Sequence, residues 1–321
     1  MPWATVRRWM LPALWVVITM ALVLTVPRLP WSLAAEAASR AAPGWIALAV
    51  LANLVILPMW AAEWRLLVPG RTVGFRPLLE IVVTSAAVLN TVPMLAGEAS
   101  AVALLMTRAG LSRGAALSVL ALDQMLVAFA KIAVLALAAL VSPVPPWVKA
   151  GTVSLAAVFL LLGTSLTVVS HRWESLAARL ATGVSLARQS LARLLTWGRH
   201  LEALRDARRA ASVAALALAK KAAEVAAAVS VQVALGVPPD IAAATVVVAA
   251  LALSTLVPIA PGNVGVYEAT VFAVYRFFGI APEVALALAV VQHLAFLAPS
   301  ILPGYVMLTA RQLVPRWRRA G

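Results

Sequence analysis

Two glutamates, Glu98 and Glu268, each follow a helix-breaking stretch inside otherwise apolar sequence. The helix breakers are Pro93 and Gly97 before the first glutamate, and Pro258, Pro261, Gly262 and Gly265 before the second. Unwound backbone survives in hydrocarbon only where protein or a water-filled cavity satisfies its amides, and a carboxylate at membrane depth is a candidate binding group. We therefore expect both breaks to border a polar cavity. The alternative is that the second break is a short loop outside the membrane with a solvated glutamate.

Further polar side chains accompany the two breaks and are expected to hydrogen-bond a polar substrate in that cavity. They are Asn90, Asp123 and Gln124 near the first break, and Asn263, Tyr267, Gln292 and His293 near the second. Lys131 is expected to neutralise Asp123 or Glu98, because pairing lowers the cost of a buried charge. A histidine changes charge near neutral pH, so His293 would permit a proton-coupled cycle. The alternatives are that each glutamate only caps the free amides of its own break, and that His293 is a hydrogen-bonded structural residue.

The composition is that of a polytopic membrane protein. Hydrophobic residues make up 63% of the 321 positions and charged residues only 12%, which excludes a soluble globular domain. The net charge of +14 comes from arginines between apolar runs, the pattern of cytoplasmic loops that face anionic lipid, so no nucleic-acid partner is expected. The absence of cysteine, together with only three histidines, argues against an enzyme, a metal site or another cofactor.

The apolar runs predict an all-α fold of about six full transmembrane helices. The expected spans cover residues 9–26, 45–64, 115–141, 151–169, 210–235 and 282–309. The arms beside the first break have about 12 residues each, too few to cross a bilayer alone at a rise of 1.5 Å per residue. Each break therefore belongs either to one broken span or to a re-entrant hairpin, over residues 78–109 and 240–279.

Loop charges favour two re-entrant hairpins in an inverted repeat. The arginine-rich segments, including the linker 171–209 and both termini, all fall on the cytoplasmic side only if the first break is a hairpin. Alignment of residues 110–117 with 279–286 then brings Glu98 opposite Glu268, within one residue. Inverted repeats with broken helices are typical of alternating-access transporters. The linker predicts a basic amphipathic helix on anionic lipid; an irregular linker is the alternative.

We expect a single transmembrane domain over residues 1–321. Its parts are two spans in 1–77, the first repeat in 78–141, a span and the arginine-rich linker in 142–209, a span and the second repeat in 210–310, and a basic tail in 311–321.

The second break resembles a known family signature. Pro258, Pro261-Gly262, Gly265 and Glu268 are similar to the P-x-x-P-G-x-x-G-x-x-E motif of the flippase-like membrane family named after the transmembrane region of lysylphosphatidylglycerol synthase. Pro93, Gly97-Glu98 and Gly110 resemble its first conserved segment. The resemblance implies a protein of the bacterial inner membrane that moves or handles polar lipids. Because no aminoacyl-transferring domain is present in the sequence, a stand-alone member is expected.

Departures from the family pattern bear on the substrate. Where the family usually carries arginines, this chain has Ala101 after the first glutamate and the pairs Asp123-Gln124 and Gln292-His293 in the following spans. Losing those cations removes groups suited to grip a phosphate. The resemblance then implies either a flippase for a less anionic polar or isoprenoid-type lipid, such as a hopanoid, or an accessory scaffold subunit of a lipid biosynthesis pathway. A channel would need an oligomer, and the sequence leaves the oligomeric state open.

Overall fold

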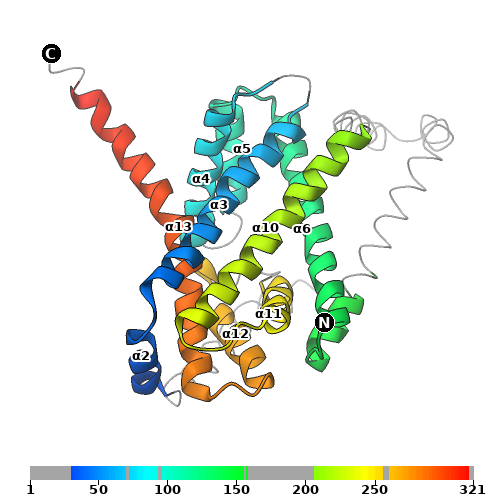
Figure 1. Ribbon diagram of the computed structural model, residues 1–321. Coiled ribbons are helices and arrows are strands. Elements are labelled where there is room, and N and C mark those ends of the chain that lie inside the picture. The colour runs from blue at the N-terminus through cyan, green and yellow to red at the C-terminus, as the bar shows by residue number, and fades with distance from the viewer. Residues whose placement is uncertain are drawn as a thin grey trace, which may run out of the picture.

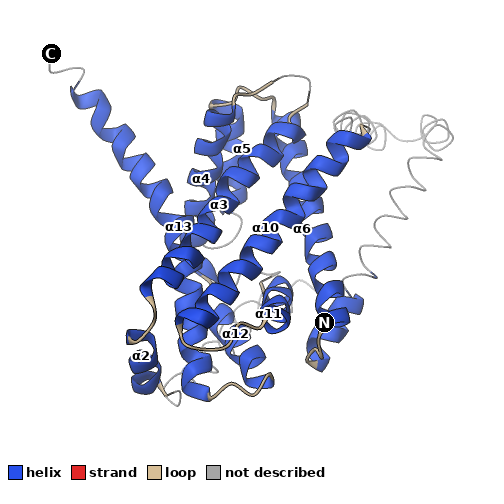
Figure 2. Cartoon of the chain, in the orientation of Figure 1, coloured by secondary structure: helices blue, strands red, loops and turns tan. Residues whose placement is uncertain are grey.

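The structure, a computed structural model, describes residues 30–69, 72–92, 96–154, 157, 206–255 and 260–317. The expected first span, most of the span 151–169 and most of the arginine-rich linker lie outside the described residues, as do Pro93 and Pro258. The described elements are helices joined by loops, without a strand among them (Figure 2), so the expected all-α fold is confirmed for this part of the chain.

The helices follow one another with a break in each of two regions. They are α2 (Trp31–Ser39), α3 (Pro43–Leu67), α4 (Phe75–Thr91), α5 (Ala96–Thr107), α6 (Arg113–Val141), α10 (Ala207–Ala234), α11 (Ile241–Ser254), the short 3₁₀ helix η3 (Pro261–Asn263), α12 (Val266–Phe277) and α13 (Pro282–Trp317). Of these described helices, α3, α6 and α13 are each long and apolar enough to cross a membrane. The chain is therefore a multi-pass membrane protein. Helix α10 is as long but carries more charge, including Lys220 and Glu224.

Two pairs of short helices flank the two breaks. Helix α4 packs against α5, and α11 packs against α12. Figure 1 shows the first pair in the upper half of the molecule and the second pair in the lower half. Gly97 allows the first pair to pack closely, since a Cβ at this position would lie 2.6 Å from the Cβ of Leu89.

The long helices enclose these pairs. Helix α10 lies along α3, and α13 lies along α4 (Figure 1). Gly304 of α13 faces α4 so closely that a Cβ there would lie 2.4 Å from the Cβ of Ala87. Small residues permit such close helix contacts where hydrocarbon surrounds the protein. One apolar core, around Trp64, contains residues of the series of helices from α3 to α6. A second core, around Tyr275, contains residues of the series from α10 to α13.

Candidate functional site

The second break is held by glycines and a helix cap. Gly262 and Gly265 have φ of +59° and +86°, and Asn263 has φ of +56°, so the chain takes a left-handed path that glycine and asparagine tolerate best. The amide of Gly265 donates a 2.7 Å hydrogen bond to Oε2 of Glu268. Glu268 therefore caps the start of α12 with one carboxyl oxygen and keeps the other for a second partner.

That second partner is His293 on α13, which is 1% exposed. Its Nδ1 lies 2.7 Å from Oε1 of Glu268, and its Nε2 lies 2.8 Å from the carbonyl oxygen of Gly262. A carbonyl only accepts, so Nε2 carries a hydrogen and donates it. The 2.7 Å contact then holds one more proton, on either the imidazole or the carboxyl, and the pair as a whole is neutral. This arrangement fastens the break to α13 and places a movable proton beside it.

An aromatic and amide layer covers the histidine. Tyr267 stacks on His293, with ring centroids 4.1 Å apart and planes 6° from parallel. The side-chain amide of Gln292 donates to the Tyr267 hydroxyl over 3.3 Å. The structure thus brings together the candidates predicted around the second break: Glu268, His293, Tyr267, Gln292 and, through its backbone, Gly262.

The two breaks meet near Gly262. A Cβ on Gly262 would lie 3.1 Å from the carbonyl oxygen of Asn90, at the end of α4, and 3.1 Å from Cδ2 of Leu297. The Asn90 side chain turns back on its own helix and donates to the carbonyl of Ala86 over 2.9 Å. Nearby, Thr91 of α4 and Tyr305 of α13 share a 2.7 Å hydroxyl hydrogen bond. We call this region, formed by Asn90, Gly262 and Leu297, the junction.

Several buried acceptor oxygens of the predicted residues have no donor among the described residues. They are Oε2 of Glu98, Oδ1 of Asn263, Oε1 of Gln292 and Oδ2 of Asp123. A buried polar group without a partner costs about 1–3 kcal/mol, so such groups cluster where a ligand or water binds. The first three lie on α5, on η3 and on α13, which places acceptors on both breaks and on the long helix that packs against them.

Three of the predicted residues lie on α6, away from the second break. Asp123 is 1% exposed and accepts hydrogen bonds from the indoles of Trp60 and Trp64 on α3, at 2.8 and 3.0 Å. Gln124 is exposed on the surface of α6. Lys131 lies near Lys221 and Glu224 of α10. Eight positions of helix separate Lys131 from Asp123 by about 12 Å along the axis.

Sequence reasoning missed Glu63, which is fully buried on α3, with its Oε2 2.8 Å from Nζ of Lys220. The available signal was that Glu63 is the one charged residue in the apolar run 43–64. Helix α3 continues to Leu67, which carries this glutamate inside the bundle.

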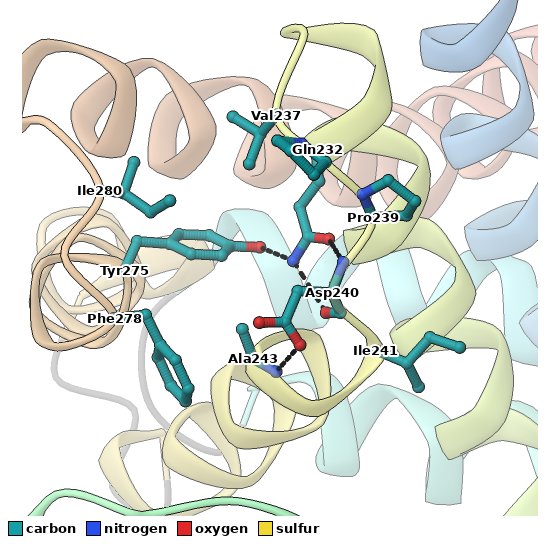
Figure 3. A pocket seen from close by; sticks show the side chains of 10 residues that line it. Gln232, Val237, Pro239, Asp240, Ile241, Ala243, Tyr275, Phe278 and Ile280 are labelled. Carbon is teal, nitrogen blue, oxygen red and sulfur yellow. Dashed lines mark hydrogen bonds between the residues drawn. The ribbon is translucent and has the colours of Figure 1, made fainter.

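A pocket of about 520 Å³ lies at the far ends of α11 and α12, away from the break (Figure 3). Gln232 points toward Tyr275 and Asp240 there, donating to the tyrosine hydroxyl over 3.2 Å and accepting from the Asp240 amide over 2.8 Å. Because these polar groups bond one another, they tie the loop before α11 to α12 and offer a ligand little. Within the part of the chain that the structure describes, no acidic and histidine side chains group as a metal site.

Comparison with known proteins gives one family. The sequence model of the family described as the lysylphosphatidylglycerol synthase TM region matches residues 13–304, a range that holds both breaks and every residue of the junction. A search of curated proteins found no match.

Proposed function

The chain belongs to the family of the lysylphosphatidylglycerol synthase transmembrane region, and from this premise we propose that it moves a lipid with a polar head group across the membrane through the junction. The observation that carries the proposal is the meeting of the two breaks at Gly262 and Asn90, with unpartnered acceptors on both sides. A head group would occupy this polar place while its tail remains in the bilayer.

The arrangement of the short helices supports alternating access. The pairs α4–α5 and α11–α12 approach the middle from opposite halves of the molecule (Figure 1). In the proposed transporter they are re-entrant hairpins of an inverted repeat, and rocking one repeat against the other opens the junction to each side in turn. During this movement the contact of His293 with the Gly262 carbonyl must either break or move with the hairpin. We therefore propose that the Glu268–His293 pair holds the second hairpin in its closed position.

The free acceptors indicate the class of head group. Glu98, Asn263 and Gln292 each present an oxygen without a donor, which suits a head group that donates hydrogen bonds through amine or hydroxyl groups. A bare phosphate would need donors and cations instead. We therefore favour an amine- or polyol-bearing lipid, including a hydroxylated isoprenoid of the hopanoid kind, over a strongly anionic one.

Orientation and surroundings complete the proposal. The arginine distribution favours the bacterial inner membrane, with both termini and the linker 171–209 on the cytoplasmic side against anionic lipid. No step requires a metal, a cofactor or catalysis.

An accessory role in lipid biosynthesis is the second candidate. It is favoured by the completeness of the bonding at Glu268, whose two oxygens already bond Gly265 and His293. In that case the break is a rigid structural element, and nothing passes it.

Reconstitution of the purified protein into liposomes distinguishes lipid transport from the accessory role. Acyl-labelled lipids with ethanolamine, glycerol, sugar or bare phosphate head groups are followed by chemical quenching of the label in the outer leaflet, against protein-free liposomes. The proposal predicts translocation of the donor-bearing lipids and little of phosphatidic acid. Translocation of none of them by protein with a normal helical spectrum would favour the accessory role.

A further inference from the structure

A second buried polar cluster lies between α3, α6 and α10, three helices that pack against one another. Its members are Glu63, Asp123 and Lys220, which are 0%, 1% and 8% exposed. Nζ of Lys220 lies 2.8 Å from Oε2 of Glu63 and 5.9 Å from the centre of the Trp60 ring. Oδ1 of Asp123 accepts from both Trp60 and Trp64. The cluster is thus held from all three helices.

The cluster holds two carboxyl groups and one cation. Trp60 links them, since its indole donates to Asp123 and its ring lies beside Nζ of Lys220, which pairs with Glu63. Oε1 of Glu63 and Oδ2 of Asp123 have no donor among the described residues. Full ionisation would therefore leave one uncompensated negative charge beside Lys220 in a site with almost no solvent, which is costly.

We infer that Glu63 and Asp123 form a proton-binding site, in which one proton bound at the two carboxyl groups balances the charge of the cluster with Lys220. One added proton neutralises the cluster. The site is separate from the Glu268–His293 pair, which belongs to α12 and α13.

Several other charged groups near these helices have partners of their own. From α4, Arg76 and Glu80 pair with each other at 3.5 Å, and from α13, His293 bonds Glu268. Lys131 of α6 lies near the Lys221–Glu224 pair of α10, whose atoms are 2.6 Å apart. Lys220 is the cation that pairs with Glu63.

Loss of the proton would leave an uncompensated negative charge between α3 and α6 and weaken the contact between these helices. Helix α3 leads into the first hairpin, and α6 follows it in the chain. The protonation state is therefore coupled to the position of that hairpin. This last step rests on the proposed lipid transport, whereas the proton site itself does not.

Infrared spectroscopy of the full-length protein in liposomes tests the site. A protonated carboxyl group has a carbonyl stretch distinct from that of a carboxylate, and isotopic labelling of glutamate and aspartate identifies its source. We expect this band in the wild type at neutral pH, its retention in Glu36→Gln, an exposed carboxylate on α2, and its loss or shift in both Glu63→Gln and Asp123→Asn. Glu63→Gln retains the shape of a protonated carboxyl and its ability to donate a hydrogen bond.

Absence of the band from the wild type, or a band unchanged in both variants, would overturn the inference. If one variant does not fold, the other variant and the labelled wild type still test the proton-binding site. Transport is measured separately under an imposed pH gradient. If no lipid moves but the infrared band behaves as expected, the proton site stands and the proposed transport fails. If lipid moves and the band is absent, transport stands and the proton site fails.

Discussion

Replacement of Gly262 by alanine is the sharpest perturbation of the junction. Gly262 needs a left-handed backbone, with φ of +59°, and also has no room for a side chain, because a Cβ would lie 3.1 Å from the Asn90 carbonyl and from Leu297. Its own carbonyl accepts the bond from His293, so any displacement also stretches that contact.

The expected cost can be divided into its causes. Placing an alanine at positive φ costs about 1–2 kcal/mol, and forcing a methyl group into a tight contact costs about 1–3 kcal/mol. Gly262→Ala should therefore lower the free energy of unfolding by about 2–5 kcal/mol. Gly236 and Gly279 are matched controls, since both have positive φ, of +73° and +79°, and nothing within 4 Å of the added Cβ. Their alanine variants should lose only the conformational part, about 1–2 kcal/mol.

The measurement is unfolding in mixed micelles, followed by the helical circular dichroism signal, for the three variants and the wild type. The reasoning is refuted if Gly262→Ala is no more destabilised than Gly236→Ala and Gly279→Ala, because the two breaks would then not be in contact at this point.

Two further predictions use the same unfolding measurement. Lys220→Met should lower the free energy of unfolding by about 3–5 kcal/mol, because it leaves the buried carboxyl groups without their cation. Adding Glu63→Met should restore most of that free energy. A double variant as unstable as Lys220→Met alone would contradict the ion pair. Gly304→Ala should cost about 1–3 kcal/mol by separating α13 from α4, whereas Gly44→Ala, which meets nothing within 4 Å, should be neutral or stabilising. Equal effects of the two glycine changes would exclude the close crossing.

Both breaks were predictable because proline and glycine act locally. The expected hairpin 240–279 contains helices α11 and α12 almost end to end, since the breakers and the glycine at 279 mark every boundary. Helix α4 begins at Phe75, before residue 78 where the first hairpin was expected to begin, because Pro77 is tolerated in the first turn of the helix. Both Glu268 and His293 were expected to serve the second break, whereas the bond between them was found only in the structure.

The cluster at Asp123 was not predictable in the same way. The internal repeat aligns Asp123-Gln124 with Gln292-His293, yet only the second pair faces its break. The partners of Asp123 come from α3, about 60 positions earlier in the chain, and no local pattern encodes that contact. Long-range packing of α3 against α6 and α10 decides which buried charges meet.

The most direct test of the central claim is the variant Asn263→Gly, measured for both stability and lipid translocation. Asn263 has φ of +56° and a buried acceptor without a donor, so glycine relieves backbone strain and removes an unpartnered group. If that oxygen serves a passing head group, the free energy of unfolding should stay the same or rise while translocation in liposomes falls about two- to tenfold, the value of one lost hydrogen bond. Unchanged translocation, or a loss of stability that accounts for the loss of transport, would contradict a head-group site at the junction.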